Sequence, residues 1–237
     1  MFPLKTTERL NSWPVVTWLL IAINVYVFIQ QLYVADPDAF IQHWGLVPQH
    51  FPHLFAPQKA EITSGWQAYA PFLTSMFLHG GLWHLLGNML SLWVFGPNVE
   101  DRFGHMRFGV IYLACGLAAA ITHIAFSGAS AIPVVGASGA IAGVMGGFFV
   151  MFPKAKVVSV IPIWIVPVIV RVPAFVFLVF WIGMNVINAL TEMQLSFTGA
   201  QSAGVAWWAH IGGFVIGMLY GLLLAKKAPA SGDTKAG

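Results

Sequence analysis

Polar side chains interrupt otherwise apolar segments at four positions: Ser138, His210, His84 and Asn88. Serine becomes a nucleophile when an adjacent base accepts its proton, and histidine suits that role near neutral pH. His84 and Asn88 are four residues apart, so they share one helical face and could donate hydrogen bonds to an oxyanion, as could the backbone N–H of Ser138. These residue types predict attack of Ser138 on a carbonyl group, with His210 as general base.

Each of these residues also has a less specific interpretation. Serine in a membrane helix usually serves packing or bonds its own backbone. His84 and Asn88 could form a polar contact between helices, His79 is expected to make a structural loop contact, and His210 could be a satisfied buried group or a proton relay. Other catalytic patterns are missing from the sequence: "GASGA" is not G-x-S-x-G, and there is no H-E-x-x-H. No carboxylate lies in the apolar segments that carry the four residues, which leaves a Ser–His dyad.

The composition indicates whether such a site belongs to a soluble protein or to a membrane protein. The chain has 237 residues, of which 58% are hydrophobic and 8% charged, whereas a soluble domain carries roughly 25% charged residues. The mean hydropathy is +0.79. We therefore expect an integral membrane protein in contact with the lipid bilayer. The charges lie between the apolar runs, so the net charge of +3 does not indicate a nucleic-acid partner.

The apolar runs predict an all-α membrane protein with six spans. A helix needs about 20 residues to cross the hydrocarbon core. The predicted spans are residues 14–33, 82–96, 107–126, 138–152, 172–191 and 206–225. Residues 34–81 form a long, partly structured outer loop, 157–170 an inner interfacial loop or a distorted extension of the fifth span, and 226–237 a disordered tail.

Basic residues favour the cytoplasmic side of a membrane. With residues 1–13 inside, ten of the eleven Lys and Arg residues fall in inner segments, and Lys59 alone falls outside. We therefore expect both termini to be cytoplasmic, in what we interpret as a bacterial cell (inner) membrane.

The four polar residues are expected to lie at a similar depth in the membrane. The fourth span has about 15 residues, hence roughly 22 Å of helix, against about 30 Å of hydrocarbon. The sequence Phe152-Pro153-Lys154 marks its inner end, so Ser138 begins a helix below the outer surface. His210, His84 and Asn88 fall at a similar depth in their own spans.

Glycine ladders suggest how these spans approach one another. Glycines four residues apart let membrane helices pack backbone to backbone. Gly136 gives the loop before Ser138 the freedom to turn into the helix. The two ladders are Gly139, Gly143 and Gly147 in the fourth span and Gly213, Gly217 and Gly221 in the sixth. One begins beside Ser138 and the other three residues after His210, so their packing would bring hydroxyl and imidazole together.

Three motifs carry a family resemblance: "HGGLWHLLGN" with His79, His84 and Asn88, "GASG" at 136–139, and "AHIGGFVIG" with His210. "EDRFGHMRF" and "FPKAKV" add to it. Over roughly residues 70–225 the chain resembles the rhomboid intramembrane serine proteases. The resemblance implies a six-helix core and the same roles for Ser138, His210, His84, Asn88 and the Ser138 N–H. It also implies no metal or organic cofactor, and single-span membrane proteins as substrates, cut near the outer face.

The resemblance further implies that the fifth span and residues 194–205 form a lateral gate and cap. Two positions depart from the family pattern. Many relatives carry an aromatic residue where this chain has Ala142, which leaves Trp207 or Trp208 to orient His210. Many carry Trp-Arg where this chain has Ala70-Pro71. Two alternative functions stay open: a catalytically silent relative that binds membrane helices, and a small transporter that relays protons through His84 and His210.

Overall fold

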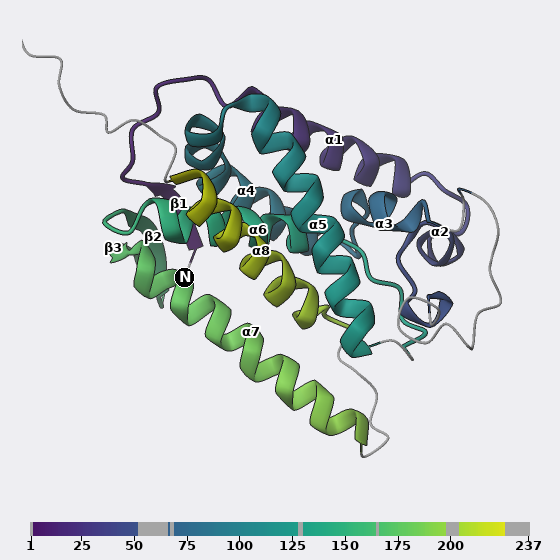
Figure 1. Ribbon diagram of the computed structural model, residues 1–237. Coiled ribbons are helices and arrows are strands. Elements are labelled where there is room, and N and C mark those ends of the chain that lie inside the picture. The colour runs from purple at the N-terminus through teal and green to yellow at the C-terminus, as the bar shows by residue number, and fades with distance from the viewer. Residues whose placement is uncertain are drawn as a thin grey trace, which may run out of the picture.

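The computed structural model describes residues 2–51, 66, 69–127, 130–164, 166–197 and 204–225. Six long helices form a bundle (Figure 1): α1 (Val15–Gln31), α4 (Leu82–Phe103), α5 (His105–Ser127), α6 (Ser138–Met151), α7 (Ala174–Phe197) and α8 (Trp207–Ala225). The predicted all-α membrane bundle is confirmed, and a small sheet accompanies it. The predicted tail at 226–237 and half of the predicted cap at 194–205 (residues 198–203) lie outside the described residues.

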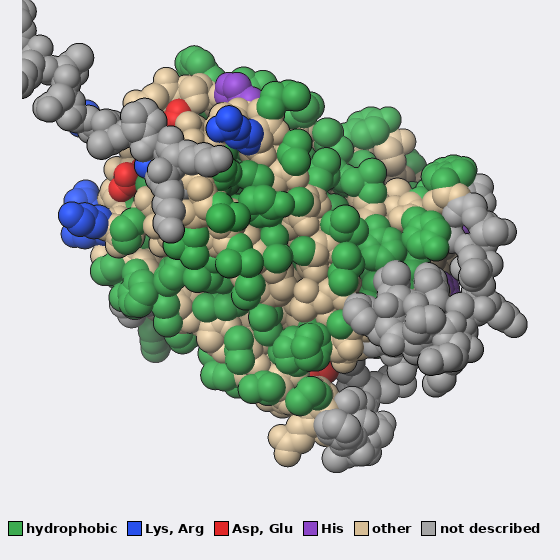
Figure 2. Space-filling view, in the orientation of Figure 1, with side chains coloured by type: hydrophobic (Ala, Val, Ile, Leu, Met, Phe, Trp, Pro, Cys, Tyr) green, Lys and Arg blue, Asp and Glu red, His purple; other side chains and the backbone are tan. Residues whose placement is uncertain are grey.

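Length and composition separate these helices into two groups. Within the described residues, four are long and apolar enough to cross a membrane: Val15–Leu32, His105–Ser127, Ala174–Leu195 and Trp207–Leu224. α6 is apolar but has only 14 residues. Hydrophobic side chains cover the middle of the face in Figure 2, with Lys and Arg at one end.

The second span is longer than predicted. We expected it to end at residue 96, before Pro97, but α4 continues through that proline to Phe103 and has 22 residues. Its last turns keep Val99 and Phe103 in the apolar core, while their polar side chains find partners. The side chain of Asn98 accepts a hydrogen bond from Thr6 Oγ1 at 2.7 Å, and Glu100 is fully buried against α1.

Segment 157–170 is a β-hairpin, which corrects the prediction of an interfacial loop or an extension of the fifth span. β2 (Lys156–Ile163) pairs antiparallel with β3 (Val166–Pro173), and β1 (Phe2–Thr6) adds to β2. The order is β1-β2-β3, so part of the predicted N-terminal tail is a strand. The density of Val and Ile favours strands, and the two prolines that suggested a loop pair with each other beside the turn. We call this end of the bundle the sheet end.

The opposite end, where α6 and α8 begin, is called the serine end. Short elements cover it: α2 (Pro37–Trp44), η1 (Pro48–His50), α3 (Pro71–Thr74) and η5 (Ser75–Phe77). Leu46 bridges to Val134, so the first loop packs on the segment that leads to α6. Pro71, one of the two residues that depart from the family pattern, begins α3, where a missing N–H costs nothing.

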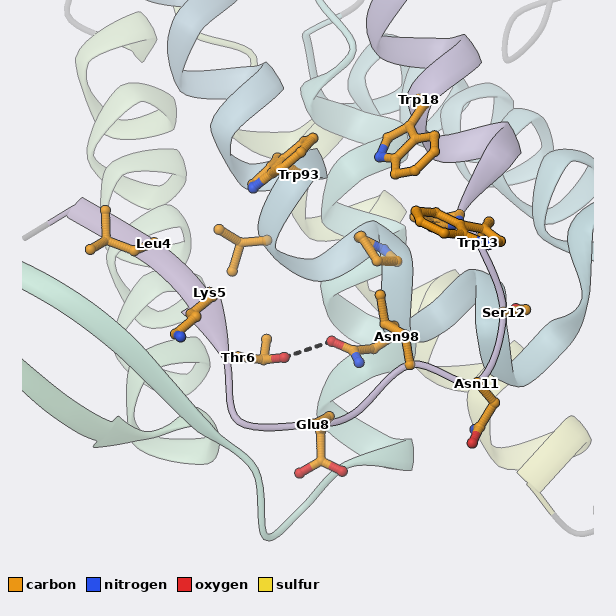
Figure 3. A pocket seen from close by; sticks show the side chains of 14 residues that line it. Leu4, Lys5, Thr6, Glu8, Asn11, Ser12, Trp13, Trp18, Trp93 and Asn98 are labelled. Carbon is orange, nitrogen blue, oxygen red and sulfur yellow. Dashed lines mark hydrogen bonds between the residues drawn. The ribbon is translucent and has the colours of Figure 1, made fainter.

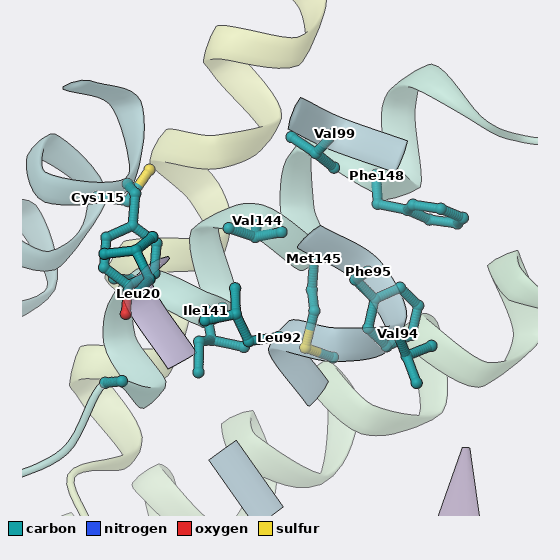
Figure 4. Packing of buried hydrophobic residues seen from close by; sticks show 14 of the residues in the cluster. Leu20, Leu92, Val94, Phe95, Val99, Cys115, Ile141, Val144, Met145 and Phe148 are labelled. Atoms are coloured by element: carbon teal, nitrogen blue, oxygen red, sulfur yellow. The ribbon is translucent and has the colours of Figure 1, made fainter. Parts of the chain in front are cut away.

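α6 lies at the centre of the bundle. Every residue of the run 139–148 is buried. Ile141, Val144 and Met145 pack among buried side chains of α4 and α5 (Figure 4), and Phe148 meets Phe95 of α4 edge to face, with ring centroids 5.2 Å apart. The residue that begins this helix is therefore held by neighbours on all sides of the helix.

A cavity of about 490 Å³ lies at the sheet end between the N-terminal segment, α1 and α4. Trp13, Trp18 and Trp93 line one side, and Lys5 and Asn98 lie on the other (Figure 3). Tryptophan is enriched where protein meets the membrane–water interface. This cavity is at the far end of the bundle from Ser138.

Candidate active site

Ser138 and His210 meet at the serine end. Ser138 is the first residue of α6, and His210 lies in the first turn of α8. The distance between Ser138 Oγ and His210 Nε2 is 2.8 Å, within the range that nucleophile activation requires. Each helix begins at the same depth, so the pair forms between two helix N-termini.

Asn185 of α7 holds the other side of the imidazole. Its Oδ1 lies 2.6 Å from His210 Nδ1. The ring of Trp181, one turn earlier on α7, lies 5.7 Å from the His210 ring at 36°. An oxygen that accepts from Nδ1–H leaves Nε2 free to accept the serine proton, which is the tautomer that a general base needs.

We expected Trp207 or Trp208 to orient His210 in place of the aromatic residue that many relatives carry at the position of Ala142. Trp207 contacts His210 edge to face, with ring centroids 6.1 Å apart. Trp208 instead stacks on Phe126, at 4.1 Å and 11°. Ala142 is fully buried. The ring of His210 is therefore enclosed by Trp181 and Trp207, from α7 and α8.

Gly136 joins the α4 residues to Ser138. Its φ is +123°, which side chains rarely tolerate, and its N–H donates to Ser75 O at 2.8 Å. A Cβ at this position would lie 2.8 Å from His84 Nε2 and 3.4 Å from Asn88 Nδ2. The loop thus lies directly against both α4 side chains, two residues before the serine.

A chain of hydrogen bonds positions Asn88. Its Nδ2 lies 3.0 Å from His79 Nε2. Burial, with a smaller contribution from His84, lowers the pKa of His79 to about 4, so the ring is neutral at pH 7 and its Nε2 can accept. Gln31, at the end of α1, bonds the N–H and the carbonyl of His79 at 3.0 and 3.1 Å. His79 thus links the end of α1 to the side chain of Asn88.

Two more N–H groups point to the same place. His84 Nδ1 lies 3.5 Å from the Gly80 N–H, a long contact that leaves Nε2 as the protonated nitrogen facing Gly136. Ser138, at the start of α6, presents a backbone N–H without an i−4 partner in the helix. The helix dipole makes that position favourable for negative charge. With Asn88, these groups could bind an oxyanion.

The glycine ladders pack differently from one another. Side chains at Gly213 or Gly217 would collide with the carbonyls of Gly139 and Gly143, so α8 lies directly on the backbone of α6. Gly139 and Gly143 themselves face α5, where an added Cβ would meet Ala119 at 2.5 Å or Cys115. Gly147 and Gly221 have looser neighbours. The α6 ladder therefore allows close approach of α5 as well as of α8, the sixth span.

Some residues of the site were not predicted. Asn185 and Trp181 lie on the fifth span, whereas the prediction of a dyad rested on the absence of carboxylates from the second, fourth and sixth spans. Gly146 contacts Phe214 of α8 as closely as the predicted glycines do. Asn185 had a usable signal, because an amide in an apolar span must find a partner.

Comparison with known proteins places the chain in a family. Residues 65–227 match the family described as "Rhomboid domain". The chain belongs to the rhomboid family. RHOMBOID-like protein 4 of Arabidopsis thaliana is 32% identical over 246 residues, which cover 93% of this chain and 55% of that protein. Rhomboid protein 1, mitochondrial, of Saccharomyces cerevisiae is 30% identical over 71% of this chain and 44% of its own length.

A bacterial rhomboid relative is named as a protease. Rhomboid protease GluP of Bacillus subtilis is 38% identical over 138 residues, which are 57% of this chain and 24% of that protein. The chain spans about half the length of the first of these relatives. Membership of the family supports peptidase activity, and the roles of single residues rest on the geometry above.

Proposed function

We propose that this rhomboid is an intramembrane serine endopeptidase that cleaves single-span membrane proteins with a Ser138–His210 pair. The 2.8 Å contact between Ser138 Oγ and His210 Nε2 carries the proposal. A protein that only binds membrane helices has no use for this pair, nor for an imidazole whose opposite nitrogen is fixed by Asn185.

The reaction follows from the arrangement of groups. His210 Nε2 accepts the hydroxyl proton while Ser138 Oγ attacks the peptide carbonyl. The oxyanion accepts hydrogen bonds from the Ser138 N–H, the Asn88 amide and the His84 imidazole. His210 then gives its proton to the leaving amine, and water hydrolyses the acyl-enzyme by the same steps. No metal or organic cofactor has a part in this scheme.

The position of Ser138 suggests where substrates are cut. The 14 residues of α6 span about 21 Å, which is less than the roughly 30 Å of hydrocarbon. We place the serine end toward the outer face of a bacterial cell membrane, with both termini in the cytoplasm. The scissile bond then lies just below the outer surface, where a substrate helix can unwind.

A serine-directed fluorophosphonate tests the proposal directly. The purified protein in detergent should be labelled covalently and should cleave a helix-destabilised membrane substrate. Ser138→Ala should lose both activities. His210→Ala should slow labelling by about 100-fold or more, since general-base catalysis contributes at least that much.

Ser130→Ala is the matched control, because Ser130 also lies at the serine end and its Oγ bonds only a local N–H. It should label and cleave like the parent. Labelling of Ser138→Ala at the parental rate would overturn the assignment of the nucleophile. A folded parent protein that neither labels nor cleaves would favour the catalytically silent alternative.

A further inference from the structure

Asn185 makes two hydrogen bonds that together determine the protonation of His210. Its Nδ2 donates to the carbonyl of Trp181 at 2.7 Å, and its Oδ1 faces His210 Nδ1 at 2.6 Å. A carbonyl oxygen can only accept, so the amide nitrogen must be the atom that faces Trp181. The amide oxygen is therefore the atom that faces His210.

The consequence for His210 is a single tautomer. An amide oxygen requires a proton on Nδ1, which leaves Nε2 with its lone pair toward Ser138. Among the described residues, Asn185 is the one hydrogen-bond partner of His210 Nδ1. Without it the ring could adopt either tautomer, and Nε2–H would face the hydroxyl in one of them. Asn185 is only 4% exposed, so water does not readily replace its oxygen.

α7 is the helix that carries this amide, and it lies at the surface of the bundle. Only 22% of its most apolar stretch is buried against the other helices, compared with 50% for α5. Figure 1 shows it along one edge of the bundle. Its ring contacts are with neighbours on one side: Phe175 stacks on Phe149 of α6 near the sheet end, Phe177 lies against Phe95 of α4, and Trp181 lies against Phe214 of α8.

We propose that Asn185 is a positioning residue for His210, and that α7 must be seated against α8 for the serine to be activated. This inference rests on the proposed protease function. Displacement of α7 from α8 separates Oδ1 from Nδ1, and the base loses its productive tautomer. A movement of α7 would therefore change the protonation of His210 and, through it, the activation of Ser138.

Asn185→Leu removes the acceptor and keeps the shape of the side chain. We expect the fluorophosphonate labelling rate and the kcat for a membrane substrate to fall about 10- to 100-fold, part of the usual contribution of a general base. KM should change less than twofold. Asn185→Asp keeps an oxygen toward Nδ1 and should recover labelling relative to Asn185→Leu.

Asn24→Leu is the matched control. Asn24 is also buried, and it also donates its Nδ2 to the carbonyl four residues earlier, at 2.8 Å, but it lies on α1 away from His210. Its folded fraction should label at the parental rate. Parental labelling by Asn185→Leu, or an equal loss in Asn24→Leu, would overturn the positioning role.

The tautomer has a readout that needs no activity. Side-chain ¹⁵N NMR, with His210 assigned by its loss in His210→Gln, should show Nδ1 protonated and Nε2 unprotonated in the parent. Asn185→Leu should mix or reverse these states. An unchanged His210 spectrum contradicts the inference, whether or not the protein proves to be a protease. A parent that shows this tautomer but does not label contradicts only the proposed function.

The role of α7 has its own test in a double-mutant cycle. Phe175→Ala removes the ring contact between α7 and Phe149 of α6 at the sheet end, far from Ser138 and His210. It should slow labelling of the parent several-fold and have little further effect in Asn185→Leu, because both act through the same contact. Effects that multiply independently would show that seating of α7 does not act through Asn185.

Discussion

Asn88 shows how one side chain can depend on residues that never touch a substrate. Its amide is directed by His79, whose backbone is held in turn by Gln31 at the end of α1. All three are buried. The amide has two N–H groups, so one can bond His79 while the other remains for an oxyanion.

Asn88→Leu should therefore slow fluorophosphonate labelling by about 100-fold or more, the usual cost of one oxyanion-hole donor. Gln31→Leu removes the side chain that holds the backbone of His79, which in turn contacts Asn88. It should slow labelling by a smaller factor. Rates are compared per folded molecule, judged from thermal unfolding. If Asn88→Leu labels within twofold of the parent, the amide does not stabilise the oxyanion.

The residues that sequence alone indicated share one property, which is polarity in an apolar span. That property, together with depth, the glycine ladders and the family resemblance, indicated Ser138, His210, His84 and Asn88 before any distance was known. It could not show that Asn88 is shared with His79, nor that Asn185 supplies the acceptor for His210. Both contacts depend on side-chain rotamers and on which helices pack together. The spacing of residues within one helix gives no information about either.

At the scale of elements, α1 and α4 are joined by a buried carboxylate. Glu100 accepts hydrogen bonds from Val16 N at 2.8 Å, Thr17 N at 2.7 Å and Thr17 Oγ1 at 2.6 Å. The residue before α1 is Pro14, which makes no side-chain cap. A side chain from α4 thus caps α1 and satisfies N–H groups that a helix start leaves open.

Glu100→Gln places an amide N–H against these donors, and we expect a loss of about 2 to 3 kcal/mol in unfolding free energy. Denaturation with SDS in mixed micelles measures it. The neighbouring Asp101 bonds Asn11 and Ser12 at an exposed site, so Asp101→Asn should cost about 1 kcal/mol or less. Similar losses for the two variants would show that Glu100 is not the cap of α1.

The helices were predictable at this scale, and the sheet was not. Apolar length located the six helices, but α4 continues seven residues beyond its predicted end at 96 and α7 six residues beyond its predicted end at 191. β2 and β3 lie in an apolar run whose two prolines suggested a loop, yet the run is rich in Val and Ile. β1 pairs with β2, which lies more than a hundred residues later in the chain. No local pattern in Phe2–Thr6 indicates this partner.

At the scale of the whole molecule, the two ends of the bundle differ in charge. Exposed Lys154 lies beside the hairpin at the sheet end, whereas exposed Asp38 lies in α2 at the serine end. The excess of basic residues at the sheet end predicts that this end faces the cytoplasm.

Cysteine labelling tests that orientation. The one native cysteine, Cys115, is buried, so it does not have to be replaced before new cysteines are introduced. In intact spheroplasts, an impermeant maleimide should label Asp38→Cys, and it should label Lys154→Cys only after permeabilisation. The parent protein reports background labelling at Cys115. The reverse pattern would place the serine end in the cytoplasm.

The division of the catalytic pair between α6 and α8 also has a consequence for synthesis. Ser138 and His210 are 72 residues apart, and α7 with Asn185 lies between them. A ribosome that has released α6 has produced the hydroxyl but neither the imidazole nor the amide. On the proposed mechanism, the nascent chain therefore cannot cleave the other proteins being inserted around it until α8 packs against α6.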